Sequence, residues 1–210
     1  MAITYGLIVR TAGLSPLDAA LSSALVFAGA AQFLAVGLYG VGVAIPQILF
    51  AGWMLNVRHL LMSSVIARNI PPAPVHVKGL MAFGVTDEVF GVAGTEISVS
   101  TPISLARLAG LELGAYSAWV GGTVIGALAG EVIPPGLKTA MGLALYVLFT
   151  ALLAGQIKRG PVRQVVVAAA TAAAVNIVLR YGLAAGPGIA FPIAMVAGGV
   201  AGMSVPERQR

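Results

Sequence analysis

The sequence consists mainly of long apolar segments. They are separated by short polar stretches that contain glycine and proline. The segments Leu17–Leu38 and Val41–Ala67 are both longer than the roughly 20 residues that a helix needs to cross a bilayer. Only 9% of the residues are charged, against roughly 25% in an ordinary soluble domain. So few charges cannot cover a water-soluble surface, and the sequence therefore predicts a polytopic α-helical membrane protein.

Further apolar segments follow along the chain. Residues 2–12 form a short piece that ends at Arg10 and a turn-like Gly13-Leu14-Ser15-Pro16, and Ser98–Leu113 is typical of a loop or a surface helix. The segments of spanning length are Lys78–Glu96, which Thr86-Asp87-Glu88 interrupts, Gly114–Ile133, Leu137–Ile157, Val162–Arg180 and Gly188–Val205. We expect an all-α integral membrane protein with about seven to eight transmembrane helices in one transmembrane domain over residues 1–210.

Small residues recur at helical spacing in two segments, as Gly122-x3-Gly126-x3-Gly130 and Ala194-x3-Gly198-x3-Gly202. Such stripes let helix backbones approach closely in lipid, so we interpret them as packing surfaces. The residues Gly13-Leu14 and Gly29-Ala30 also match Gly110-Leu111 and Gly126-Ala127 at one constant offset. Three helices separate the matched spans, so a true repeat would be inverted, as in many secondary transporters; chance also explains four identities in so glycine- and alanine-rich a chain.

Charged side chains lie inside two adjacent apolar segments, Arg58 and His59 in one and Asp87 and Glu88 in the other. A charge at the centre of a membrane helix costs about 2.5–3.5 kcal/mol on insertion scales, and such residues are functional by default. One interpretation is a substrate or proton site, in which the carboxylates titrate and Arg58 holds an anionic group. The alternative is a buried ion pair of Arg58 with Asp87 or Glu88 that only orients two helices.

Helical geometry divides the polar residues of Val41–Ala67. At about 100° per residue, Asn56, His59 and Ser63 share one face and Arg58 points elsewhere. His59 either carries a proton near neutral pH or stays neutral and bonds to a neighbouring helix.

Gln32 is a polar side chain within Leu17–Leu38, on one face with Ser22 and Gly29. It either contacts a ligand or forms a hydrogen bond between helices. The predicted substrate or proton pathway contains six residues: Gln32, Asn56, Arg58, His59, Asp87 and Glu88.

Several classes of site and partner are disfavoured. The chain has no cysteine, so it has no disulfide and no zinc, haem or iron–sulfur site that needs one. It contains no G-x-S-x-G, H-E-x-x-H or G-x-x-x-x-G-K motif, and we expect no enzyme activity, catalytic residue, cofactor or metal. The net charge of +5 comes from basic residues that lie mainly between apolar segments, which favours anionic lipid headgroups over nucleic acid as the partner.

A set of motifs follows one order and spacing over most of the chain. It consists of Gly13-Leu14-Ser15-Pro16, Leu25-Val26-Phe27-Ala28-Gly29-Ala30-Ala31-Gln32-Phe33, Asn56-Val57-Arg58-His59-Leu60-Leu61-Met62, Thr86-Asp87-Glu88-Val89-Phe90 and Trp119-Val120-Gly121-Gly122-Thr123. Together these motifs resemble those of the AzlC family of branched-chain amino acid exporters. In that family a further apolar stretch usually precedes the position of Tyr5-Gly6, so we expect either a truncated first helix or a start further upstream.

The resemblance implies a multi-pass permease of the cytoplasmic (inner) membrane. It implies the large subunit of an exporter that works with a small AzlD-like membrane subunit and expels valine-like, small hydrophobic amino acids. The leading hypothesis is a secondary transporter coupled to the proton gradient. The alternatives are a channel, whose flux follows the electrochemical gradient alone, and a non-transporting membrane assembly subunit.

Overall fold

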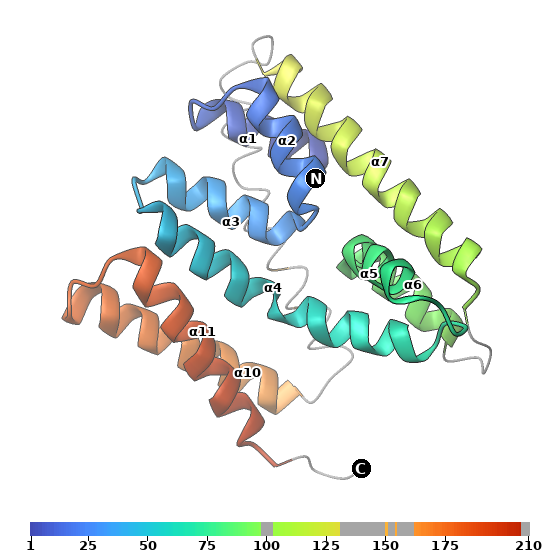
Figure 1. Ribbon diagram of the computed structural model, residues 1–210. Coiled ribbons are helices and arrows are strands. Elements are labelled where there is room, and N and C mark those ends of the chain that lie inside the picture. Colours follow the sequence, from blue (N-terminus) through green and yellow to red (C-terminus); the bar gives the residue numbers. More distant parts are fainter. Residues whose placement is uncertain (98–102, 131–149, 151–153, 155–161, 207–210) are drawn as a thin grey trace. The chain divides into compact units, whose positions relative to one another are not determined.

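Helices make up the regular structure of the protein (Figure 1). The computed structural model describes residues 1–97, 103–130, 150, 154 and 162–206, and no strand occurs among them. The helices are α1 (Ala2–Thr11), α2 (Pro16–Val26), α3 (Gly29–Gly40), α4 (Ile45–Arg68), α5 (Val75–Gly84), α6 (Asp87–Ile97), α7 (Leu105–Ala129), α10 (Val162–Ile177), the π-helical η1 (Val178–Gly182) and α11 (Pro187–Met203). The predicted all-α class is confirmed for this part of the chain.

The helices form two compact units. The first comprises Met1–Phe33 and Leu55–Lys138, and the second comprises Leu34–Met54 and Thr139–Arg210. Both α3 and α4 contribute residues to each unit. The predicted site residues all belong to the first unit.

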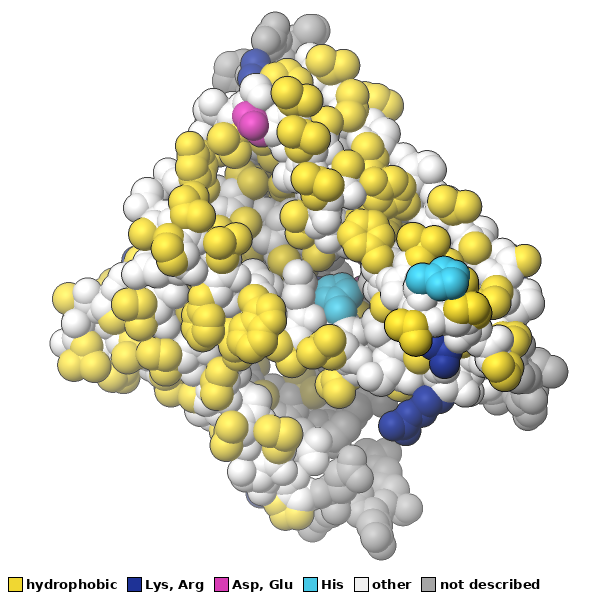
Figure 2. All heavy atoms as spheres, in the orientation of Figure 1, with side chains coloured by type: hydrophobic (Ala, Val, Ile, Leu, Met, Phe, Trp, Pro, Cys, Tyr) yellow, Lys and Arg dark blue, Asp and Glu magenta, His cyan; other side chains and the backbone are white. Residues whose placement is uncertain are grey.

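Two stretches of helix are long and apolar enough to cross a membrane, α4 and the continuous Val162–Gly182. Only 11% and 0% of their most apolar windows are buried, whereas a core helix of a soluble protein is mostly buried. Hydrophobic side chains also cover much of the face seen in Figure 2. Apolar surface of this extent needs lipid or protein against it. The number of about seven to eight crossings stays a prediction, and the segment Leu137–Ile157 lies almost entirely outside the described residues.

The predicted continuous span Leu17–Leu38 is wrong, because the chain breaks after α2. Phe27 adopts a left-handed conformation with φ of 41°, and α3 begins at Gly29. The side chain of Gln32 accepts a hydrogen bond from the Ala28 N–H at 3.2 Å and so satisfies a donor at the start of α3. We call residues 27–28 the first break.

The interruption predicted at Thr86-Asp87-Glu88 is confirmed. α5 ends at Gly84, Val85 is extended, and α6 begins at Asp87, where the Thr86 hydroxyl accepts a hydrogen bond from the Val89 N–H. We call residues 85–86 the second break. The helices beside the two breaks have 10 to 12 residues each, so none alone reaches the roughly 20 residues of a crossing.

The predicted boundary between a surface segment ending at Leu113 and a span from Gly114 is also wrong. A single helix, α7, runs through it from Leu105 to Ala129, and Ser104 caps its start by accepting from the Arg107 N–H. The apparent internal repeat fails with it, because Gly110 lies inside this helix whereas Gly13 lies in a turn with φ of 83°. The first matched pair therefore differs in structure, whereas Gly29-Ala30 and Gly126-Ala127 are both helical.

The small-residue stripes do serve helix packing, as predicted. A Cβ placed on Gly126 would overlap the main-chain oxygen of Ile3, so α1 and α7 touch backbone to backbone. A Cβ on Gly198 would lie 2.6 Å from the main-chain oxygen of Ala168, so α10 and α11 also pack closely. Larger side chains at either glycine would push the helices apart.

Candidate functional site

The charged residues of α4 and α6 meet at the second break. Arg58 and Asp87 form an ion pair, with 2.7 Å between Nη2 and Oδ2. Both side chains are about one-third exposed, at 32% and 33%. Asp87 is the first residue of α6, so the pair joins the middle of α4 to the restart of the broken helix.

Three residues on one stretch of α4 carry buried polar atoms that lack a partner. The atoms are Asn56 Oδ1, Arg58 Nε and His59 Nδ1, and none of them forms a hydrogen bond of good geometry with a described residue. Buried polar groups are almost always satisfied by protein or ordered water. We call Asn56, Arg58 and His59 the α4 polar turn. Its unsatisfied hydrogen-bonding atoms fit a place where water or a polar ligand binds.

The α4 polar turn lies in a shared electrostatic environment with the start of α6. His59 feels the charges of Arg58 and Asp87 and, more weakly, that of Glu88, whose side chain is exposed. The structure therefore brings together five of the six predicted pathway residues: Asn56, Arg58, His59, Asp87 and Glu88.

A groove between α4 and α5 begins at His59. Its volume is about 590 Å³, within the range of small-molecule pockets. His59 and Ser63 line it and Arg58 does not, as the helical geometry predicted, but Asn56, which that geometry placed on the same face, does not line it either. Its other walls are mainly apolar and include Ile66, Met81 and Phe83, and Lys78 adds a further polar side chain. Apolar walls with a few polar groups suit a small amphipathic ligand.

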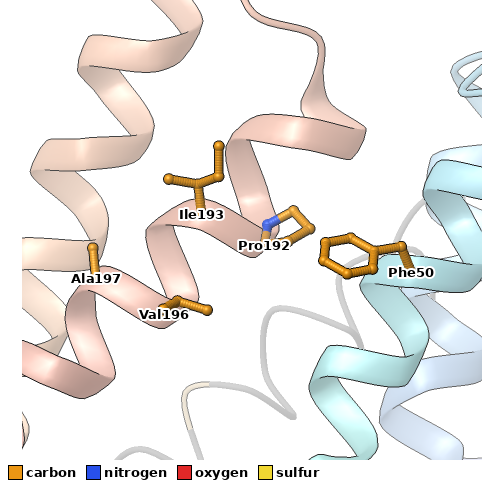
Figure 3. Close-up of a pocket in the computed structure, with 5 residues that line it drawn as sticks. All are labelled: Phe50, Pro192, Ile193, Val196 and Ala197. Atoms are coloured by element: carbon orange, nitrogen blue, oxygen red, sulfur yellow. The ribbon is translucent and has the colours of Figure 1, made fainter.

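A smaller cavity lies in the second unit, between α4 and α11 (Figure 3). Its volume is about 310 Å³, and its lining consists of Phe50, Pro192, Ile193, Val196 and Ala197. These side chains offer no hydrogen bond and no charge with which to orient a polar ligand. This cavity is therefore the weaker candidate for a substrate site.

Gln32 lies in a different environment, a hydrogen-bonded network among α2, α3 and α7. Its Oε1 accepts from Trp119 Nε1 at 3.0 Å, and its Nε2 donates to Ser23 Oγ at 3.4 Å. Ser23 Oγ in turn donates to Thr123 Oγ1 at 2.8 Å. Gln32 is 3% exposed and both ends of its amide have partners, which favours the interhelical role over ligand contact.

One face of α7 touches both breaks. We define this α7 contact face by residues at spacings of three and four, which lie above one another on a helix: Glu112, Tyr116, Trp119 and Thr123. The ring of Tyr116 packs against Phe27 at the first break and Phe83 beside the second, with centroids 5.1 and 6.3 Å away, and the two phenylalanine rings also contact each other at 6.2 Å. Its hydroxyl donates to the carbonyl of Ala24 near the end of α2. The last carbonyls of a helix receive no hydrogen bond from within the helix, so Tyr116 satisfies one of them.

Glu112 is the residue of this region that the sequence analysis missed. Its side chain is 5% exposed and lies against Gly84, where a Cβ would overlap the carboxylate. Its Oε1 has no hydrogen-bond partner among the described residues. The missed signal was the spacing of Glu112 from Tyr116 and Trp119, which continues one helical face across the predicted boundary at Leu113.

The comparisons with known proteins agree with the motifs. The family model described as AzlC protein matches residues 1–133. An uncharacterized membrane protein of Archaeoglobus fulgidus is 39% identical over 179 residues, which is 84% of this chain and 77% of that protein. Inner membrane protein YgaZ of Escherichia coli is 31% identical over 164 residues, or 76% of this chain and 67% of that protein. No solved structure matches.

Proposed function

We propose that this chain, which belongs to the AzlC family, is the large subunit of a secondary transporter that exports branched-chain and similar small hydrophobic amino acids. Membership is shown by the family match over residues 1–133 and by relatives named as membrane proteins. The chain is thus a membrane protein of a family associated with transport. We assign to it the transport of substrate across the cytoplasmic membrane, without catalysis. The chain itself crosses that membrane several times.

The observation that supports this function best is the α4 polar turn beside an apolar groove. An amino acid has a carboxylate, an ammonium group and, in this class, a small apolar side chain. Arg58 suits the carboxylate because its guanidinium presents a planar set of donors, and Asp87 suits the ammonium group. The groove that begins at His59 and Ser63 suits the side chain. Substrate binding would then exchange the Arg58–Asp87 pair for two new pairs of opposite charge.

The two broken helices give this arrangement a mechanical context. Transporters commonly build their substrate sites from discontinuous helices, because unwound backbone near a cavity can change shape. Here the ion pair lies at the second break, and the α7 contact face links that break to the first. Rearrangement at the second break would move Asp87 relative to Arg58, and so open or close the substrate site.

A small AzlD-like membrane subunit is the partner that we propose. The support for it is the family resemblance, in which large and small subunits act together. Co-expression with the small subunit is expected to raise the yield of the folded chain and its transport. Full transport by this chain alone would contradict the proposed partner and leave the proposed substrate class intact.

Efflux from membrane vesicles tests the function. Vesicles are loaded with labelled valine, leucine, isoleucine or methionine, with and without the partner, and with the proton gradient intact or collapsed. The expected result is efflux above that of vesicles lacking the chain, and its loss when the gradient is collapsed. Flux that ignores the proton gradient would indicate the channel, and no flux of any of the four would indicate the assembly subunit.

A matched pair of variants separates the site from the surface. Arg58→Gln removes the basic residue of the ion pair at the second break. Arg107→Gln removes the basic residue of the exposed Arg107–Glu96 ion pair. The first variant is expected to lose efflux and the second to keep it. Equal efflux from both would remove the α4 polar turn from the proposed pathway.

A further inference from the structure

Glu112 differs from the other described acids of the first unit in being buried. Asp87 pairs with Arg58 and Glu96 pairs with Arg107, whereas Glu112 forms no ion pair with any described residue. It is nevertheless the most buried of the three, at 5% exposure. Burying an isolated carboxylate costs far more free energy than burying the neutral acid. The surroundings of Glu112 therefore favour a bound proton.

No charged side chain on the helices packed against α7 forms an ion pair with Glu112 in the described part of the chain. α1, α2, α5 and α6 all contact α7. Their titratable or charged side chains are Tyr5 and Arg10 on α1, Asp18 on α2, His76 and Lys78 on α5, and Asp87, Glu88 and Glu96 on α6, with Arg107 and Tyr116 on α7 itself. No hydrogen bond or ion pair joins any of these side chains to Glu112 within the described residues.

The position of Glu112 links it to the substrate site. Gly84, on which its carboxylate packs, is the last residue of α5, and Asp87 is the first residue of α6. The second break thus has Glu112 on one side and the Arg58–Asp87 pair on the other. A change in the charge of Glu112 acts on the same two residues of unwound backbone that a bound substrate would move.

We propose that Glu112 carries the proton whose movement drives export, an inference that rests on the proposed function. A proton from water on one side of the membrane bonds to a carboxylate oxygen and gives the neutral acid. The same proton returns to water on the other side as the carboxylate re-forms, and no electron is transferred. The ionised form is disfavoured in the buried site against Gly84, so proton release favours rearrangement of the second break and of Asp87 with it.

The test compares driven and undriven transport in inverted vesicles that contain the chain with its partner. Glu112→Gln imitates the protonated acid but cannot release a proton, and Glu96→Gln makes the same change at an exposed acid. One assay is valine accumulation driven by an acidic lumen. The other is exchange of labelled for unlabelled valine with no gradient. We expect Glu112→Gln to lose accumulation and keep exchange, and Glu96→Gln to keep both.

Two results would overturn the proposal. Accumulation by Glu112→Gln at the wild-type level shows that the coupling proton is elsewhere. Loss of both assays in a folded Glu112→Gln protein shows that Glu112 serves the substrate or the fold. If the wild type moves none of the four amino acids, the proposed function has failed and the inference fails with it, a result distinct from normal coupling without Glu112.

An infrared measurement covers the case in which Glu112→Gln does not fold. The wild type at neutral pH is expected to show the carbonyl stretch of a protonated carboxyl, and Glu112→Asp is expected to shift that band. Glu96→Asp is the control and should leave it unchanged. Absence of the band from the wild type, or an unshifted band in Glu112→Asp, would contradict protonation of Glu112.

Discussion

Trp119 donates a hydrogen bond from Nε1 to Oε1 of Gln32, 3.0 Å away, and so joins α7 to the first turn of α3. The same face of α7 reaches the second break through Tyr116 and Glu112. A continuous helix thereby holds two interrupted ones in register. We expect α7 to act as the fixed element of the first unit and the breaks as its movable elements.

Close packing of α1 on α7 gives the first prediction. Gly126→Ala would place a methyl group on the main-chain oxygen of Ile3, so α1 must move. Overpacking of this kind costs about 1–3 kcal/mol. Gly121→Ala lies on the same helix with nothing within 4 Å and serves as the control. Thermal unfolding in detergent should show a lower Tm for Gly126→Ala only; equal Tm values would refute this packing.

The hydrogen bond between Ser23 and Thr123 gives the second prediction. Thr123→Val removes the acceptor of a fully buried hydroxyl and should destabilise the protein by about 1 kcal/mol. Ser23→Ala combined with Thr123→Val removes both partners, so its effect should be smaller than the sum of the single effects. Denaturation of the wild type, Ser23→Ala, Thr123→Val and the double variant measures the coupling free energy between the two side chains. Strict additivity would contradict the bond, and the exposed Ser204→Ala should change nothing.

The ion pair at the second break gives the third prediction. Asp87→Asn and Arg58→Gln each strand a charge, and we expect each to lower the free energy of unfolding by about 1–3 kcal/mol. That is less than for a fully buried pair, because both side chains are about one-third exposed, at 32% and 33%. The double variant should regain stability but not export, since the proposed substrate site needs Arg58. Wild-type export by the double variant would remove both residues from the substrate site.

Sequence reasoning predicted the helical class and the polar residues of α4 and α6 because apolar length and intramembrane charge are local signals. It also identified the second break, since Thr86-Asp87-Glu88 interrupts an apolar run. The first break has no such signal: Phe27 and Ala28 are apolar, and the break is satisfied by the side chain of Gln32 and by contacts with α7. Those contacts come from residues far apart in the chain.

The partners of the polar residues could not be assigned for the same reason. Arg58 could pair with Asp87 or Glu88 as far as the sequence shows, and only the start of α6 at Asp87 selects between them. Glu112 was missed because a charged residue near Arg107 is typical of a surface segment. Its burial depends on Gly84, a glycine of another helix whose missing side chain makes room for a carboxylate.

The groove between α4 and α5 is the part of the proposed substrate path that can be probed most directly. The chain has no cysteine, so single cysteines can be introduced without removing others. Ser63→Cys places a thiol in the groove, and Leu61→Cys places one at a position that is 70% exposed but does not line it. Labelling with a water-soluble thiol reagent is measured with and without saturating valine, leucine, isoleucine or methionine. The account predicts that Ser63→Cys is labelled and that an exported amino acid slows this labelling, while Leu61→Cys, which we expect to face lipid, is not labelled. Labelling of Ser63→Cys that none of the four amino acids changes, in a protein that still exports one of them, would contradict it.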